Sequence, residues 1–146
     1  MRIAGIDYGT VRIGIALADT EVRIATPFAN YPRRTEPLDA AYFRKLVNEQ
    51  QIDRFVVGLP VHLDGRESQK SSEARAFANW LSTTTGLPVE FFDERFTTTE
   101  ADELLGAANL TKKQRKARRD QLSAQIMLTA YLESGGRGED APGGIE

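Results

Sequence analysis

The sequence predicts an α/β domain in which a mixed, five-stranded sheet is flanked by helices. The chain opens with a β-hairpin pattern, continues with a third strand, and then alternates helical and strand patterns. Its 146 residues are about the length of one domain. We expect a single domain over residues 1–133. Five glycines and a proline fall in residues 134–146, which predicts a flexible C-terminal tail.

Two apolar runs begin the chain, and a short turn that contains Gly9 separates them. Such a pair predicts a β-hairpin, with Asp7 at the end of its first strand. A carboxylate at the end of a central strand is costly to bury unless a cation or hydrogen bonds compensate it. Asp7 is therefore a candidate metal ligand. The alternative is that Asp7 only forms the turn, with its side chain bonded to nearby backbone.

Further elements follow the hairpin in a regular order. A third strand over residues 22–31 contains Pro27 and therefore belongs at a sheet edge. Short apolar runs predict two more buried strands, at residues 54–58 and 88–92. Apolar periodicity and stop signals predict four helices, at residues 38–51, 72–84, 98–108 and 111–133.

This order of elements is the pattern of the ribonuclease H-like fold, whose strands lie in the order 3-2-1-4-5. The first, fourth and fifth strands would have their carboxyl ends at one edge of the sheet, where open α/β sheets usually bind ligands. Asp7, Asp93 and Glu94 are then expected at that edge, together with the turn after Gly58. Gly58 either brings backbone close to a substrate or only forms a strand-end turn.

Asp120 is a further acid that the pattern directs toward this edge. On the last helix it shares one face with large apolar side chains, which predicts that this face docks on the sheet. The apolar members of the face are Ala124, Met127, Leu128 and Tyr131. The alternative is a surface acid that pairs with Lys116, one turn earlier.

Three or four oxygen ligands, in a chain with no cysteine and a single histidine, suit Mg²⁺ or Mn²⁺ rather than zinc. Two such ions can orient an attacking water and stabilise a leaving oxygen, which is the chemistry of phosphodiester hydrolysis. The acids therefore favour a metal-dependent nuclease.

The basic residues are concentrated in one segment. Residues 112–119 hold six of them, which leaves a net charge of −8 for the rest of the chain against −2 for the whole. This segment suits contact with nucleic-acid phosphates, although a solvated helix face has the same pattern. Arg95 could alternatively pair with Asp93. The candidate phosphate contacts are Arg12, Arg95, Lys112, Lys113, Arg115, Lys116, Arg118 and Arg119.

Composition excludes several classes of protein. Without cysteine, the chain has no disulfides and no thiolate metal sites. No stretch approaches the roughly 20 apolar residues of a membrane span, and the start of the chain has no signal-peptide pattern. We expect a cytoplasmic protein that does not contact membranes, and we leave a homodimer open.

At this point the chain resembles a known family. Matching motifs run in the expected order through residues 1–133: Gly5-Ile-Asp7-Tyr8-Gly9-Thr10, Ile13-Gly14-Ile-Ala16, Val57-Gly58-Leu59-Pro60, Asp64-Gly65, Phe92-Asp93-Glu94-Arg95-Phe96-Thr97-Thr98 and Asp120-Gln-Leu-Ser123-Ala124. They are similar to those of the YqgF/RuvX family of RuvC-like nucleases with a ribonuclease H-like fold. The resemblance implies maturation of the pre-16S ribosomal RNA, or resolution of Holliday junctions, with a divalent metal.

The resemblance also implies site residues. The catalytic acids would be Asp7, Glu94 and Asp120, and the same three would bind metal. Asp93 could replace Glu94 as a ligand, and the sequence does not decide between them. RuvC resolvases resemble this chain in fold, but here the last helix offers only one acid, which leaves a second metal less strongly held.

Three functions are compatible with these patterns. The first is a metal-dependent endonuclease on structured RNA or DNA. The second is a non-catalytic nucleic-acid-binding module that retains the fold. The third is a phosphotransferase, because the motif around Asp7 and Gly9 also occurs in the phosphate-binding hairpin of actin-like kinases. Those enzymes need two such domains, so the length of this chain disfavours the third.

Overall fold

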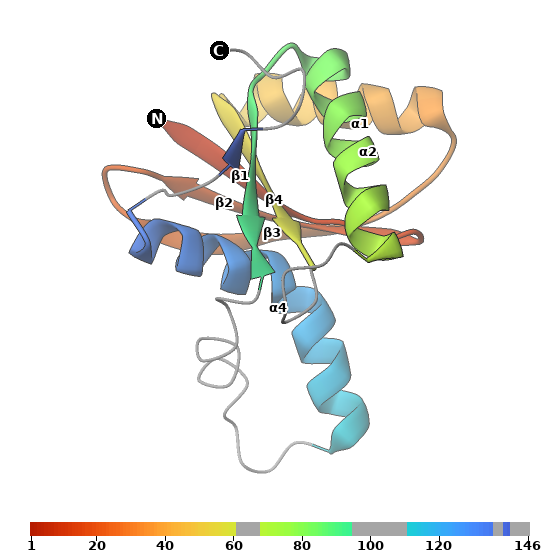
Figure 1. The fold of residues 1–146 in the computed structure, drawn as a ribbon, viewed down its shortest axis with the longest axis vertical. Coiled ribbons are helices and arrows are strands. Elements are labelled where there is room, and N and C mark those ends of the chain that lie inside the picture. Colours follow the sequence, from red (N-terminus) through yellow and green to blue (C-terminus); the bar gives the residue numbers. More distant parts are fainter. Residues whose placement is uncertain (61–67, 95–110, 136–138, 141–146) are drawn as a thin grey trace.

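The computed structural model describes residues 1–60, 68–94, 111–135 and 139–140, with the backbone alone for residues 112–121 and 139–140. One mixed sheet forms the centre of the molecule, and its strands lie in the order β3-β2-β1-β4-β5-β6. Helices cover both faces of this sheet (Figure 1). The predicted fold class and the predicted order 3-2-1-4-5 are therefore confirmed.

The first five strands of the sheet lie close to their predicted positions, and a sixth follows near the end of the described chain. They are β1 (Arg2–Asp7), β2 (Arg12–Asp19), β3 (Ile24–Pro32), β4 (Arg54–Leu59), β5 (Val89–Asp93) and β6 (Glu139–Asp140). β3 pairs only with β2, so it is an edge strand as predicted. It begins two residues later than expected, because Arg23 adopts a left-handed conformation (φ 63°) in the preceding turn.

The other strands of the sheet are added on either side of the hairpin of β1 and β2. The two strands are antiparallel, and Asp7 lies opposite Gly14 in the last pair of the register. Between the strands, a Cβ on Gly9 would overlap the carbonyl oxygen of Arg12, so this tight turn requires glycine. β4 then pairs parallel to β1, and β5 parallel to β4. The carboxyl ends of β1, β4 and β5 consequently share one edge of the sheet.

The sixth strand was not expected from the sequence. Glu139 and Asp140 pair antiparallel with β5, within the segment predicted to be a flexible tail. Two acidic residues give no apolar pattern, so nothing in the sequence distinguishes this strand. The prediction of flexibility for residues 136–138 and 141–146 lies outside the described residues, as does the helix expected over residues 98–108.

Two helices pack on one face of the sheet. α1 (Glu36–Gln50) and α2 (Gln69–Thr85) enclose the larger core with Phe43, Phe55 and Leu81. α2 ends at Thr85, and its C-cap residue Gly86 is left-handed (φ 74°). Its start was predicted wrongly at Ser72.

The true start of α2 is set by a capping box of two serines. The Ser68 hydroxyl accepts a hydrogen bond from the backbone N–H of Ser71 (3.0 Å), and the Ser71 hydroxyl accepts one from the Ser68 N–H (2.8 Å). A capping box usually has Glu or Gln at the second position. The serine there hid this helix start in a segment that resembles a polar loop.

The opposite face of the sheet is covered by α4 (Lys112–Glu133), which packs on β1, β2 and β3. The four apolar residues predicted to dock on the sheet are all buried: Ala124, Met127, Leu128 and Tyr131. Gly5 allows the close approach of this helix, because a Cβ at Gly5 would lie 3.0 Å from the Cβ of Leu128. No described helix is long and apolar enough to cross a membrane.

The close packing at Gly5 predicts a stability effect. Gly5→Ala should lower the free energy of unfolding by ~1–3 kcal/mol, because the added methyl group must push Leu128 and α4 away from β1. Urea denaturation measures this difference. As a control, the exposed Asn79→Ala should change the free energy of unfolding by less than ~0.5 kcal/mol. An unchanged midpoint for Gly5→Ala would contradict the packing.

Candidate active site

Strand alternation places Asp7 on the α4 face of the sheet. Ile3 packs in the core beneath α4, and alternate residues of a strand share a face, so Gly5 and Asp7 lie on that face as well. A Cβ on the opposite residue, Gly14, would lie 3.4 Å from the Cβ of Asp7 and 3.6 Å from the Cβ of Ala124. Asp7 therefore lies in the narrow space where the end of β1 meets α4.

Glu94 reaches Asp7 across the strand between them. It follows the last residue of β5, and β4 separates β5 from β1. The Glu94 side chain occupies the space above Gly58 of β4, since a Cβ there would overlap the Glu94 carboxylate and lie 3.0 Å from its Cγ and Cδ atoms. The two roles expected for Gly58, a close approach to substrate and a strand-end turn, did not include making room for the Glu94 side chain. The missing side chain makes room for the two carboxyl groups to meet.

The Asp7 carboxyl group strongly perturbs that of Glu94. Burial, the negative charge of Asp7 and a hydrogen bond with Asp7 raise the pKa of Glu94 to about 8, and Asp93 contributes to this rise. The positive charge of Lys70 acts in the opposite direction. Two like charges in a partly buried site are unfavourable, so near neutral pH the pair tends to hold one proton.

The structure distinguishes Asp93 from Glu94 by face. Phe91 and Phe92 lie in the cores on opposite sides of the sheet, Phe92 beneath α4. Alternation makes Asp93 follow Phe91, on the face away from α4, whereas Glu94 lies over Gly58 on the α4 face. Of the two adjacent acids, Glu94 is the one that meets Asp7.

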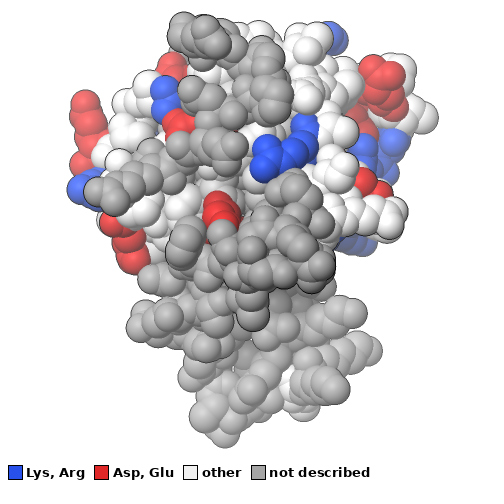
Figure 2. Space-filling view, viewed as in Figure 1, with Lys and Arg blue, Asp and Glu red and all other residues white. Residues whose placement is uncertain are grey.

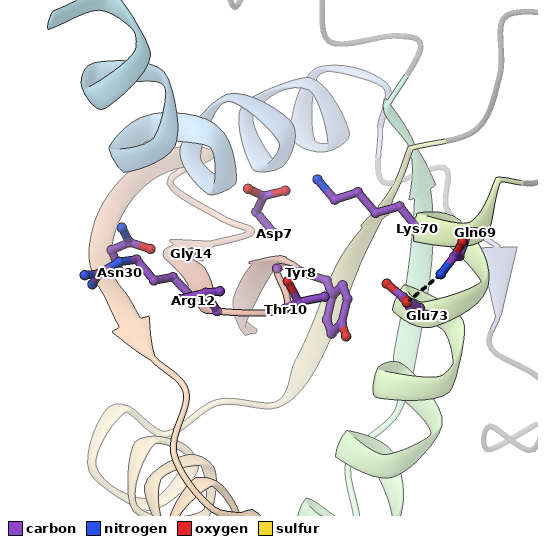
Figure 3. A pocket seen from close by; sticks show the side chains of 11 residues that line it. Asp7, Tyr8, Thr10, Arg12, Gly14, Asn30, Gln69, Lys70 and Glu73 are labelled. Carbon is purple, nitrogen blue, oxygen red and sulfur yellow. Dashed lines mark hydrogen bonds between the residues drawn. The ribbon is translucent and has the colours of Figure 1, made fainter. Parts of the chain in front are cut away.

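A cavity of about 800 Å³ opens beside Asp7. Its walls come from the hairpin turn, from β2 and β3, and from the first turns of α2: Tyr8, Gly9, Thr10, Val11, Arg12, Gly14, Asn30, Gln69, Lys70 and Glu73. In Figure 3, the side chains of Asp7 and Lys70 point toward one another, while Arg12 lies next to Asn30 on the other side of Asp7. Arg12 was expected near the acids and does line the cavity.

Lys70 is the functional candidate that sequence reasoning missed. With the helix start expected at Ser72, Lys70 belonged to a polar loop and had no defined direction. The signal that could have located it is the pair of serines, Ser68 and Ser71, at capping-box spacing. Once α2 starts at Gln69, Lys70 lies in its first turn and lines the cavity beside Asp7.

The other predicted site residues are placed only in part. The backbone of Asp120 lies on α4 one turn before Ala124, which neighbours Asp7, but its side chain lies outside the described part of the chain. The same holds for the side chains of the basic segment, residues 112–119, and Arg95 lies wholly outside. Figure 1 shows the first part of α4 projecting away from the sheet.

Charge on the described surface is mixed. In Figure 2, blue and red side chains are interspersed on the visible face, without a broad patch of one sign among the residues that are coloured.

Within the described ranges, no group of three or more His, Asp or Glu side chains is arranged to hold a metal ion. The described site is therefore a pair of carboxyl groups, with one helix position next to it whose side chain is not described.

The strand order and the acids at one sheet edge define a protein with the ribonuclease H-like fold. Solved structures of Holliday junction resolvases share this fold. RuvC from Thermus thermophilus, in complex with a Holliday junction substrate, has a TM-score of 0.58 and 15% identity over 96% of this chain and 99% of that one. The fowlpox virus Holliday junction resolvase has a TM-score of 0.52 and 11% identity over 92% of this chain and 99% of that one.

The sequence identifies the family. The family model of RuvX, described as "Holliday junction resolvase", matches residues 1–134, and the chain belongs to the RuvX family. A relative from Rhodopirellula baltica is 47% identical over 91% of this chain and 77% of its own length, and one from Koribacter versatilis is 38% identical over 97% and 92%. Both carry the name "Putative pre-16S rRNA nuclease". The family resemblance noted from the motifs is confirmed.

The raised pKa of Glu94 predicts how stability changes with pH. A carboxyl group with a raised pKa in the folded state contributes stability that is fully present below its unfolded value of 4.5 and is lost as pH rises through about 8. In metal-free protein, Glu94→Gln should remove this loss. Between pH 5 and pH 9 the free energy of unfolding of the wild type should therefore fall by on the order of 4 kcal/mol more than that of the variant, at about 1.4 kcal/mol for each of the roughly three pH units below the folded pKa.

Urea denaturation at both pH values measures the difference in free energy of unfolding. Glu73→Gln is the matched control, because this carboxylate lines the same cavity without touching Gly58, and it should retain the pH dependence of the wild type. Parallel pH profiles for Glu94→Gln and the wild type would contradict the shared proton.

Proposed function

We propose that this protein is a metal-dependent endonuclease that hydrolyses phosphodiesters of structured nucleic acid. The observation that carries this proposal is the contact of Asp7 with Glu94 beside a cavity of about 800 Å³. Paired carboxyl groups with perturbed pKa values in a cleft are typical of functional sites. Membership of the RuvX family supports it, since the family is described as a resolvase and its relatives are named as nucleases.

The residues present fit a divalent cation. Asp7 and Glu94 offer hard oxygen ligands of the kind that Mg²⁺ and Mn²⁺ prefer. Burial and the negative charge of Asp7 raise the pKa of Glu94, and a cation between the two carboxyl groups would replace the shared proton and offset their repulsion. We infer that Asp7 and Glu94 are ligands and that Asp120 adds a third carboxylate from α4. Asp93 is the less suitable ligand, because it follows the other face of β5.

The chemistry divides between the ion and the chain. When bound, the ion supplies a Lewis acid that polarises the phosphoryl group and activates water. The chain holds the phosphodiester in the cavity beside Asp7, where Arg12 binds a neighbouring phosphate. A water oxygen bonds to phosphorus while one P–O ester bond breaks. One proton of the attacking water passes to the leaving oxygen, and the products are a phosphate monoester and a hydroxyl group.

The names of the relatives favour precursor ribosomal RNA as the substrate. Relatives at 36% to 47% identity are named for pre-16S rRNA, and at that identity they are nearer to this chain than the structural neighbours are. Four-way DNA junctions are the second candidate, because the family description and the RuvC complex both refer to them. Cleavage assays on the two substrates side by side, with Mg²⁺ and with Mn²⁺, decide between them.

Asp7→Asn tests the catalytic proposal. The variant should cleave at least ~100-fold more slowly than the wild type, because a neutral amide is a much weaker ligand than a carboxylate. Its affinity for uncleaved substrate in EDTA should stay within about threefold, since the carboxylate does not bind nucleic acid. Glu49→Gln, exposed on α1, should behave as the wild type in both assays.

Two outcomes would contradict parts of this proposal. Wild-type cleavage by Asp7→Asn would remove Asp7 from the metal site. Tight substrate binding by the wild type without any cleavage, with either metal and on either substrate, would favour the non-catalytic binding module instead.

We also propose that the basic segment contacts the substrate backbone. Residues 112–119 form the start of α4, which projects away from the sheet (Figure 1). Each neutralised phosphate releases counterions, so log affinity falls with log salt concentration by ~0.9 for each contact on duplex DNA. Such contacts would hold the substrate without reading its sequence.

A triple variant tests this contact. Changing Arg115, Arg118 and Arg119 to Gln should weaken binding similarly across sequences and flatten the salt slope by up to about three contacts' worth. Arg44→Gln, on α1, is the matched control, because Arg44 is exposed and donates only to the carbonyl of Thr84 among the described hydrogen bonds. If the triple variant keeps the affinity and the salt slope of the wild type, the segment is a solvated helix face.

A further inference from the structure

The cavity beside Asp7 has a cation on its α2 wall that the sequence did not assign. Lys70 extends from the first turn of α2, and its side chain points toward the Asp7 carboxylate (Figure 3). We propose that Lys70 is a catalytic residue whose ammonium group contacts a non-bridging oxygen of the scissile phosphate. This inference rests on the proposed nuclease function and adds a residue to it.

The backbone of Lys70 is fixed relative to the carboxyl pair. The Ser68 hydroxyl donates a hydrogen bond to the carbonyl oxygen of Pro60 (3.0 Å), directly after β4. β4 is the strand that separates Asp7 from Glu94 and carries Gly58. The capping box and this bond therefore tie the first turn of α2 to the strand over which the two acids meet. Behind it, Ala74 and Phe77 are buried and dock the helix on the sheet.

The ammonium group of Lys70 faces the acids across the cavity (Figure 3). The positive charge of Lys70 lowers the pKa of Glu94 and thereby opposes burial and Asp7, which raise it. Lys70 and Arg12 both line the cavity, and in Figure 3 they lie on opposite sides of Asp7. A nucleic-acid strand that crosses the cavity would meet one cation on each side of the acids.

A phosphate at this site needs such a cation. The phosphodiester is an anion, and it must approach two carboxyl groups that already repel each other. The described site contains two acids rather than the larger set that would hold two ions firmly. Lys70 can supply positive charge on the wall that faces the acids, where charge increases on the phosphoryl oxygens during hydrolysis. A lysine acts there as a compact point charge with three donors.

Four variants test this role: Lys70→Ala, Lys70→Arg, Asp7→Asn and Lys45→Ala, the last at an exposed lysine of α1. Single-turnover cleavage is measured with the protein in excess over substrate and at a saturating concentration, and Mn²⁺ affinity is measured separately by calorimetry. Lys70→Ala should lower the cleavage rate by about 10²-fold, the usual effect of removing one donor to a developing oxyanion. Its Mn²⁺ affinity should stay within about twofold, and Lys70→Arg should recover part of the rate because it keeps the charge.

Two results would overturn the role of Lys70 and leave the nuclease intact. In the first, Lys70→Ala cleaves at the rate of Lys45→Ala while Asp7→Asn is inactive. In the second, the loss in Mn²⁺ affinity matches the loss in rate, so that Lys70 acts only by positioning the carboxyl groups.

A binding readout tests Lys70 apart from cleavage. Inorganic phosphate is titrated into three Mg²⁺-loaded proteins, the wild type, Lys70→Ala and Lys45→Ala. Binding is followed by ³¹P NMR. The variant should bind phosphate several-fold more weakly than the wild type and than Lys45→Ala. Equal phosphate affinity in all three proteins would overturn the inference even if the wild type cleaves neither RNA nor DNA. The absence of cleavage by the wild type would separately reject the proposed function.

Discussion

The meeting of Asp7 and Glu94 is the contact on which the site depends. Burial and the negative charge of Asp7 raise the pKa of Glu94 to about 8, so the pair lowers the cost of its mutual repulsion by sharing a proton. Hydrophobic packing alone would not bring these groups together. The surrounding sheet holds them there, so the rigid order of β1, β4 and β5 fixes an unfavourable pair at one edge.

Small residues on the α4 face make this arrangement possible. Neighbouring strands lie ~4.8 Å apart, so the carboxyl groups start about two strand spacings from each other. An ordinary side chain at Gly58 would fill the space that the Glu94 carboxyl occupies. Gly14 similarly lies between Asp7 and Ala124, and Gly5 lets α4 approach β1. Side chains are thus absent where the helix, the strands and the acids converge.

The sequence predicted what local patterns encode. Asp7 ends an apolar run, and the apolar period of the last helix identified its buried face, including Leu128. It could not predict contacts between strands, such as Glu94 over Gly58, because these depend on the register of β4 and β5. Which of the two adjacent acids, Asp93 or Glu94, meets Asp7 depends on the same register. Lys70 was missed for a local reason, because the serine at position 71 concealed the start of α2.

Proton, metal and phosphate are coupled at this edge through charge alone. Without a cation, the carboxyl pair retains a proton near neutral pH. The positive charge of Lys70 partly opposes this protonation, because it lowers the pKa of Glu94. A divalent ion would displace that proton, so its affinity must rise as pH increases toward about 8. Phosphate would then approach a site whose repulsion has been neutralised, with Lys70 and Arg12 on either side of Asp7. In the proposed enzyme, the repulsion that costs folding stability would thus favour binding of a cation, and the positive charge of that cation would favour the anionic substrate.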